Sequence, residues 1–334
     1  MRTFTRRALL GGAAGLAVVP ALAQERCLHI ESALRWAPDR PVRLVSPFPP
    51  GGPIDVLNCM LAERLTTSLG QPVVVDAKPG ANTILGAALV ARAPPDGHTF
   101  LITTNETHTH NPALHRQLPY DASRSFAPVT LLSTGTMLLI APADAPYGDA
   151  RDFAAWAKAL ERPVTFGSRG VGSSGHLYGA WLKAHHGLPL QHVPYRGEQP
   201  AILDMLCGKL DVTFCGPADA RPQFAAGMAR AIGATGARRS EAVPDVPSFA
   251  EQGFDGLDLS LFLAAWVPAG TSPEAVARLH DGLLCAVREE AVHATMLQQG
   301  QTPVLSTPEE LMAIVRREAP RWAELIRLAD MRAE

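Results

Sequence analysis

The chain has 334 residues, a formal net charge of −2 at pH 7, 6% aromatic residues and 29 prolines. Without the three arginines that precede residue 24, the net charge becomes about −5, which argues against nucleic acid and an anionic membrane surface as partners. The length is enough for two domains, and the composition favours α/β layers joined by short, stiff loops.

The first residues are typical of an export signal. A basic region with three arginines precedes an apolar, glycine-rich run, and an A-x-A cleavage site follows at residues 21–23. The pair Arg6-Arg7, followed by Ala-Leu-Leu, also resembles a twin-arginine signal. No stretch reaches the length of about 20 apolar residues that a membrane span needs. We therefore predict a signal peptide at 1–24, a linker at 25–40 and a mature protein in a bacterial periplasm.

The segment Pro41–Leu57 predicts a buried strand, a glycine turn and the start of a helix. Val42–Val45 forms the apolar strand, and Pro53 suits a first helical position. Gly51 and Gly52 allow the backbone to turn sharply and to approach a ligand closely. Unpaired N–H groups and the helix dipole at such a point favour a small anion. The alternative is a tight turn of the kind found in any α/β protein.

Beyond this turn, predicted strands and helices alternate, which is typical of parallel sheets with crossover helices. The expected strands are Val42–Val45, Val73–Val75, Thr99–Thr103, Met137–Ile140, Val164–Phe166, Gln191–Val193, Val212–Phe214 and Ala231–Ala234. The expected helices are Pro53–Leu69, Thr83–Ala91, Asp149–Ala159, Ser174–His185, Glu198–Cys207, Pro222–Ala226, Pro273–Glu289 and Pro308–Asp330, the last interrupted by Pro320.

Two stretches, Leu131–Ala141 and the apolar strand Leu259–Pro268, are predicted to cross between domains. The first domain is then discontinuous, with residues 41–141 and 259–334, and the second comprises residues 142–258. Two crossings create a hinge with a cleft beneath it, and such clefts commonly bind small ligands.

Two histidines in the pattern His108-x-His110, with His115 nearby, suggest a metal site if both imidazoles lie on one side of a strand. Asn111-Pro112 interrupts the segment, and no acidic or cysteine ligand has evident spacing. We expect no metal and no other cofactor, and histidines that are exposed or hydrogen-bonded.

The five cysteines are an odd, scattered set without a CxxC pair, so a disulfide framework is not expected. At most one or two bridges are possible, and buried free thiols are the expected state of most of them. The residues are Cys27, Cys59, Cys207, Cys215 and Cys285.

A second segment, residues 163–182, again combines a strand, a Gly/Ser loop and a helix, and so repeats an anion-binding geometry. Its glycines satisfy G-x-G-x-x-G, but the next strand ends without the acid that a dinucleotide fold requires. Ser173 and Ser174 lack the G-x-S-x-G pattern of a hydrolase, and we interpret them as helix caps that can also donate to a ligand oxygen. Arg169 either binds a ligand carboxylate in bidentate fashion or points to solvent at the rim.

A third candidate lies at residues 193–198, where a strand ends in an aromatic residue, a cation and a glycine before a helix. The alternative for Tyr195 is partial burial with its hydroxyl bonded to backbone.

Five motifs occur in order between about Arg40 and Ala329: PVRLVSPFPPGGPIDVL, LGQPVVVDAKPGANTILGA, FGSRGVGSSGHL, HVPYRGEQPAILDMLCGKLDV and VPAGTSPEAVARL. Together they resemble the periplasmic solute receptors of tripartite tricarboxylate transporters, known as Bug-type receptors. The resemblance implies an α/β, two-domain, type II periplasmic-binding-protein-like fold whose cleft closes on a small carboxylated solute. It also implies delivery to membrane permease subunits, with no cofactor and no catalysis, by a protein that we expect to be a monomer.

In such receptors the loops that match Phe48–Asp55 and Ser168–Ser174 hold the ligand, largely through backbone groups and bridging water. The expected ligand-binding residues are Phe48, Pro50, Gly51, Gly52, Ile54, Asp55, Thr104, Asn105, Ser168, Arg169, Gly172, Ser173, Ser174, His176, Tyr195, Gly197, Cys215 and Gly216.

Several positions depart from the family pattern, so the ligand identity does not transfer. Ile54 replaces a common threonine, and Cys215 stands where a polar residue is frequent. A loop with Asn105, Glu106 and two histidines replaces a smaller Gly/Ser-rich loop, and Arg169 adds a cation. Two other functions stay open: a sensor subunit with the same fold, and a secreted hydrolase or metalloenzyme.

Overall fold

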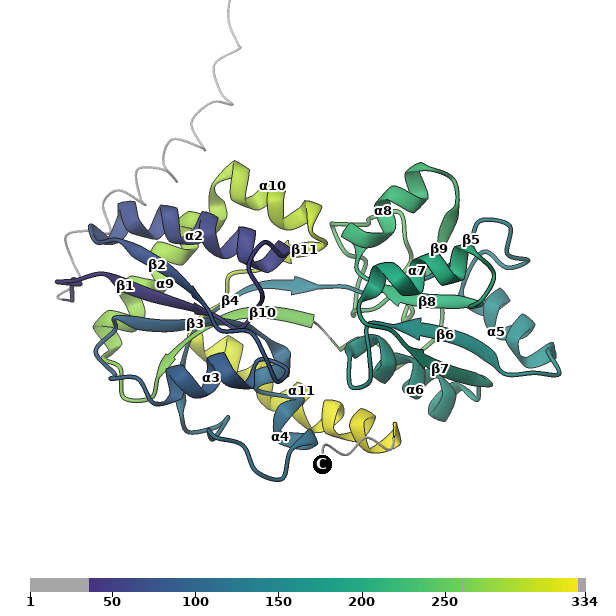
Figure 1. Ribbon diagram of the computed structural model, residues 1–334, viewed down its shortest axis with the longest axis horizontal. Helices are drawn as coiled ribbons and strands as arrows, with labels where there is room; N and C mark the ends of the chain where they lie inside the picture. The colour runs from purple at the N-terminus through teal and green to yellow at the C-terminus, as the bar shows by residue number, and fades with distance from the viewer. Residues whose placement is uncertain (1–35, 260, 330–334) are drawn as a thin grey trace, which may run out of the picture.

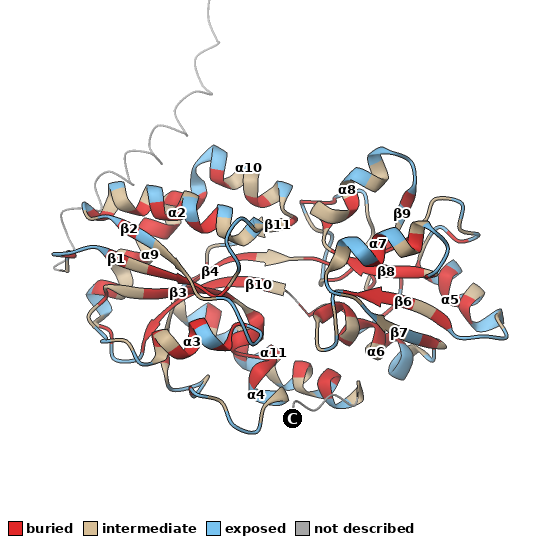
Figure 2. Cartoon of the chain, in the orientation of Figure 1, coloured by how far each residue is buried: buried red, intermediate tan, exposed pale blue. Residues whose placement is uncertain are grey.

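The computed structural model describes residues 36–259 and 261–329, which form two α/β domains side by side (Figure 1). The predicted signal at 1–24 and most of the predicted linker lie outside the described residues. Buried residues follow the strands of both sheets, and exposed residues occur on the outer faces of the helices (Figure 2). The predicted two-domain α/β fold is confirmed. No helix in the described part of the chain is long and apolar enough to cross a membrane.

The first domain contains a six-stranded sheet in the order β11-β4-β10-β3-β1-β2. β1 runs parallel to β2 and β3, whereas β10 is antiparallel to β3 and β4. The strands are β1 (Val42–Ser46), β2 (Val73–Ala77), β3 (Thr99–Thr104), β4 (Phe126–Gly135), β10 (Leu261–Pro268) and β11 (Gln301–Pro303).

Helices cover both faces of this sheet, because successive strand residues point to opposite sides. Leu44 packs in the cluster under α2 and α9, while its neighbour Val45 packs in the cluster under α3 and α11. The helical segments are α2 (Pro53–Leu69), α3 (Ile84–Ala91), η2 (Asn105–Thr107), α4 (Asn111–Leu114), α9 (Pro273–Arg288), α10 (Glu290–Gln298) and α11 (Pro308–Leu328).

The second domain contains a five-stranded sheet in the order β7-β6-β8-β5-β9, again with a core on each face. Its strands are β5 (Leu138–Pro142), β6 (Val164–Ser168), β7 (Leu190–Pro194), β8 (Val212–Cys215) and β9 (Ala229–Ala234). Its helices are α5 (Ala150–Ala159), α6 (Ser174–His186), α7 (Glu198–Leu206) and α8 (Pro217–Ala225). The expected helix Pro222–Ala226 therefore begins five residues earlier, at Pro217, and continues through Pro222.

The first crossing between domains lies earlier than the predicted boundary at residues 141 and 142. β4 ends at Gly135, and β5 already pairs with β8 and β9 of the second sheet. The segment Leu131–Ala141 contains two short apolar runs separated by Ser-Thr-Gly-Thr at 133–136, and the crossing follows this polar interruption. The chain returns to the first sheet at Leu261, where β10 begins.

α11 joins the two domains a third time. Leu311 and Val315 pack in a core of the first domain, whereas Trp322 and Leu325 pack in a core of the second. The helix continues through Pro320, so the expected interruption is wrong. A helix tolerates an internal proline at the loss of one backbone hydrogen bond when tertiary packing supports both of its halves.

The cysteines are only partly as expected. Cys285 is disulfide-bonded. Cys59 and Cys207 are free but exposed, and Cys215 is free and buried. Burial raises the pKa of the Cys215 thiol well above its usual value, which keeps it protonated and unreactive.

Candidate functional site

Two adjoining cavities of about 780 and 540 Å³ lie between the domains. Residues of both domains line each cavity, and four residues line both: Ile54, Thr104, Glu106 and Arg169. The two cavities thus form one interdomain cleft, divided where Glu106 of the first domain meets Arg169 of the second.

The first glycine turn is built as predicted, but its backbone is used internally. Gly51 has φ +80°, a conformation that favours glycine, while Gly52 has an ordinary φ of −76° and forms the N-cap of α2. The Gly51 amide donates to Asp55 Oδ2 at 2.8 Å. The Gly51 N–H, which we expected to bind a ligand, therefore donates to the chain's own Asp55 carboxylate. Phe48 and Ile54 are the expected ligand residues of this segment that line the cleft.

The second glycine loop is held by its own serines. Ser173 caps α6 by accepting from the His176 amide at 3.4 Å, as predicted, and its hydroxyl donates to the Gly170 carbonyl at 2.7 Å. Ser168 Oγ lies 2.7 Å from His192 Nε2. His192 and His176 stack with ring centroids 3.8 Å apart. Burial lowers the pKa of both imidazoles, that of His192 to about 4, so the pair is neutral at pH 7.

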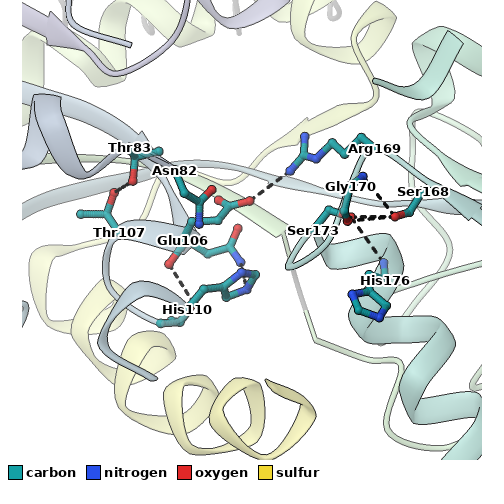
Figure 3. A network of polar contacts seen from close by, with 12 residues as sticks. Asn82, Thr83, Glu106, Thr107, His110, Ser168, Arg169, Gly170, Ser173 and His176 are labelled. Atoms are coloured by element: carbon teal, nitrogen blue, oxygen red, sulfur yellow. Dashed lines mark hydrogen bonds and ion pairs between the residues drawn. The ribbon is translucent and has the colours of Figure 1, made fainter. Parts of the chain in front are cut away.

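Arg169 reaches across the cleft from this loop (Figure 3). Its Nη2 donates to Glu106 Oε1 at 3.1 Å, which pairs the two domains electrostatically. The Arg169 side chain is 46% exposed and that of Glu106 is 6% exposed. Sequence did not reveal this partner, which lies 63 residues away in the chain.

Glu106 is a buried carboxylate in a buried loop. Burial by itself would raise the pKa of Glu106, but His110, Arg169 and the nearby Thr104 hydroxyl outweigh it, so its pKa lies below the usual range. At neutral pH the cleft therefore contains an ionised carboxylate close to the guanidinium.

The histidines of this loop have structural roles. His108 Nδ1 lies 3.1 Å from the Ala122 carbonyl, and its ring stacks on Trp266 at 3.7 Å. His110 Nε2 lies 3.0 Å from Asn105 Nδ2. Burial lowers the pKa of both histidines to about 4. The segment is a 3₁₀ turn followed by α4, not a strand, and the described residues contain no group of three metal-ligating side chains.

The turn before α3 is a part of the cleft that sequence reasoning missed. Ala81, Asn82 and Thr83 are consecutive residues with positive φ, which costs conformational energy in non-glycine residues. Asn82 and Asn111 hold the turn through two hydrogen bonds of 2.9 and 2.7 Å, and Thr83 Oγ1 lies 2.7 Å from Thr107 Oγ1. Asn82 and Thr83 line the larger cavity.

The smaller cavity also contains two acidic residues that lie close together, Glu198 and Asp219. Glu198 Oε2 accepts the Gly216 amide at 2.7 Å, and Asp219 Oδ1 accepts from Gln199 at 2.7 Å. Burial, followed by a hydrogen bond with Asp219, raises the pKa of Glu198 to about 7. The two acids in one small site hence share a proton near neutral pH.

The structure divides the expected ligand residues into two groups. Those that line the cleft are Phe48, Ile54, Thr104, Asn105, Arg169, Gly172, Ser173, His176, Gly197 and Gly216. Those that line neither cavity are Pro50, Gly51, Gly52, Asp55, Ser168, Ser174, Tyr195 and Cys215. Cys215 is fully buried among apolar residues, and the Tyr195 hydroxyl donates to Asp204 Oδ2 at 2.9 Å instead of to backbone.

Comparison with known proteins relates this arrangement to a family. The model of the tripartite tricarboxylate transporter family receptors matches residues 58–331. A protein of Pseudomonas sp., named for the tcbD–tcbE intergenic region, is 33% identical, and the match covers 94% of this chain and 92% of the relative.

Two solved structures of similar proteins contain ligands. A protein of R. palustris, solved with adipate, is 29% identical with a TM-score of 0.75, and the match covers 88% of this chain and 99% of that one. MatC of Rhodopseudomonas palustris, solved with bound malate, is 28% identical with a TM-score of 0.71, and the match covers 86% and 99%. The family match and the shared two-domain fold agree: this chain belongs to the tripartite tricarboxylate transporter receptor family.

Proposed function

We propose that the protein is a periplasmic receptor that captures a small carboxylate in the interdomain cleft and delivers it to a membrane transporter. The observation that carries the proposal is the position of Arg169, a half-exposed guanidinium in a cleft lined by both domains. Among the described residues, Glu106 is its one hydrogen-bond partner. The remaining N–H groups of the guanidinium suit a ligand carboxylate.

Capture would work through domain closure. A ligand that contacts both domains at once favours the closed arrangement over the open one, which is a shift between two populations. Arg169 and the α6 N-terminus offer contacts from the second domain, and Thr104 and Asn82 offer them from the first. Adipate and malate, found with two similar proteins, belong to the proposed ligand class.

Ligand screening tests this function. We expect at least one small mono- or dicarboxylate to raise the melting temperature of the mature protein in a concentration-dependent way, because a ligand that binds only the folded state stabilises it. Stabilisation by neutral sugars or by cations, with none by any carboxylate, would contradict the proposed solute class.

Substitutions at Arg169 then locate the site. Arg169→Ala is expected to weaken carboxylate binding by roughly 10- to 150-fold, as a charge-assisted bond of about 1.5–3 kcal/mol implies. Arg169→Lys should recover only part of the affinity, because an ammonium lacks the planar fork. Arg238→Ala, which removes an exposed arginine outside both cavities, is the control. Titration calorimetry that gives equal affinities for the wild type and Arg169→Ala would move the anion site elsewhere.

A further inference from the structure

The Glu106 carboxylate is an unexpected group in a cleft that is proposed to bind an anion. It lines both cavities, and its side chain is 6% exposed. A buried negative charge beside a bound carboxylate is unfavourable unless a positive group separates the two. The presence of Glu106 in the cleft therefore indicates that a positive group lies between it and the ligand carboxylate.

The two carboxylate oxygens of Glu106 differ in their hydrogen bonding. Oε1 accepts one hydrogen bond, from Arg169. Oε2 is buried and has no partner at ordinary hydrogen-bond geometry among the described residues, although the Thr104 hydroxyl lies near enough to help lower the pKa of the carboxyl. An ionised carboxylate can accept about four hydrogen bonds, so this group is under-satisfied where it stands.

Its partner Arg169 can leave without breaking other contacts. The guanidinium is 46% exposed, and its bond to Glu106 is a single N–H contact. Arg169 is the exposed partner and can turn to a ligand, but the buried Glu106 charge then needs another positive group, because an unpaired buried carboxylate is costly. Glu106 itself is fixed, because η2 packs against β10 and the neighbouring Asn105 and His110 are hydrogen-bonded to each other.

We propose that the ligand is a small zwitterion, a carboxylate that also carries an ammonium group, and that Glu106 binds the ammonium while Arg169 binds the carboxylate. The proposal rests on the proposed carboxylate-binding function and specifies its substrate class. Such a ligand inserts between the two side chains and replaces one interdomain ion pair by two ion pairs. Its contact with both domains then drives closure. A dicarboxylate of the same length would place its second anion against Glu106.

Matched ligands test the charge requirement on the wild-type protein. Butyrate, 4-aminobutyrate and succinate share a four-carbon chain, and valerate, 5-aminovalerate and glutarate extend the set by one carbon. Aspartate and glutamate add an α-amino group to the two dicarboxylates. Titration calorimetry on the full mature chain is expected to give at least tenfold tighter binding for the best amino acid than for its matched mono- and dicarboxylate.

The Glu106→Gln variant tests whether Glu106 is responsible for the preference for an ammonium group. The variant is expected to lose at least tenfold in affinity for the amino acid and to gain relative affinity for the dicarboxylate, while the monocarboxylate changes less than threefold. Glu161→Gln is the matched control, because Glu161 is exposed and lines neither cavity. It should leave the preference for the amino group unchanged.

The outcomes separate the two proposals. Carboxylates that bind without any advantage from an amino group would overturn the zwitterion and leave the receptor function standing. Unchanged discrimination in a folded Glu106→Gln variant would overturn the role of Glu106. Absence of binding by every carboxylate, with or without an amino group, would overturn both proposals. If Glu106→Gln does not fold, the wild-type ligand series still decides for or against the zwitterion.

Discussion

Glu106 and Glu198 both line the cleft, and their pKa values move in opposite directions. The pKa of Glu106 is lowered because positive neighbours outweigh its burial. The pKa of Glu198 rises to about 7 because burial and the neighbouring Asp219 outweigh the opposing effects of Arg169 and of the Gly216 amide. At neutral pH the Glu106 carboxyl is thus ionised, whereas Glu198 binds a proton part of the time, although sequence presents both simply as glutamates.

Glu198 is expected to make the protein less stable as pH rises. Its pKa in the folded state, about 7, lies above the unfolded value near 4.5, so its stabilising effect is complete below pH 4.5 and is lost as pH rises through 7. Glu198→Gln removes this pH-dependent loss of stability, because a glutamine side chain does not ionise. Between pH 5 and pH 8, its free energy of unfolding should improve by about 1–3 kcal/mol relative to the wild type.

Urea denaturation of the wild type and Glu198→Gln at each pH measures this difference. The buried histidines have lowered pKa values and act in the opposite direction between about pH 4 and 6.5, but they are common to both proteins and cancel in the comparison. Glu161→Gln, at an exposed position, serves as the control. Parallel pH profiles for wild type and Glu198→Gln would show that Glu198 does not bind a proton in this range.

At the scale of elements, α11 matters because its C-terminal half belongs to the second domain. Trp322 lies against both domains: its ring is 4.3 Å from that of His110 in the first and 5.6 Å from that of Tyr178 in the second. The side chain is fully buried. A single residue late in the chain therefore contributes to the contact between the domains.

Trp322→Ala is expected to lower the free energy of unfolding by about 3–5 kcal/mol, because it removes a large buried side chain and leaves a cavity. Trp322→Phe should cost less, since most of the volume is kept. Thermal and urea unfolding measure both. Trp156→Ala is the control, because Trp156 packs against the same core but is only partly buried. Equal losses at positions 156 and 322 would contradict a special contribution of Trp322.

At the scale of the molecule, two strand connections and α11 link domains that share the cleft. We expect a saturating ligand to reduce the radius of gyration measured by small-angle X-ray scattering, because it contacts both domains and favours closure. A neutral sugar at the same concentration should leave the curve unchanged. An identical radius of gyration with and without bound ligand would contradict closure as the means of capture.

Much of the local structure follows from residue patterns. The strand, turn and helix around Gly51 form where predicted, and Ser173 caps α6 as predicted. The same helix ends at His186, one residue beyond the expected end, and Gly187 caps it in the left-handed conformation at φ +64°. These features depend on neighbours within a few residues, and the sequence displays them directly.

Contacts between residues that are far apart in the sequence could not be predicted as well. The expected backbone site at Gly51 is partly occupied by Asp55, and Cys215 lies in a core instead of in the cleft. Glu106 was noticed as a departure from the family pattern but was not predicted as a site residue. The loop's departure from the family pattern indicated that Glu106 is unusual, but its role depends on the residues that surround it in the folded protein, and these could not be predicted.

The sequence alone determined the α/β class, the two-domain plan, the glycine turns and the family, because apolar periodicity, caps and ordered motifs are local properties of the chain. Only the tertiary structure decided that β5 joins the second sheet, that α11 packs on both domains and that Arg169 meets Glu106. The physical reason is that strand pairing, burial and charge pairing between distant residues depend on how the domains are placed, and no local pattern records that placement.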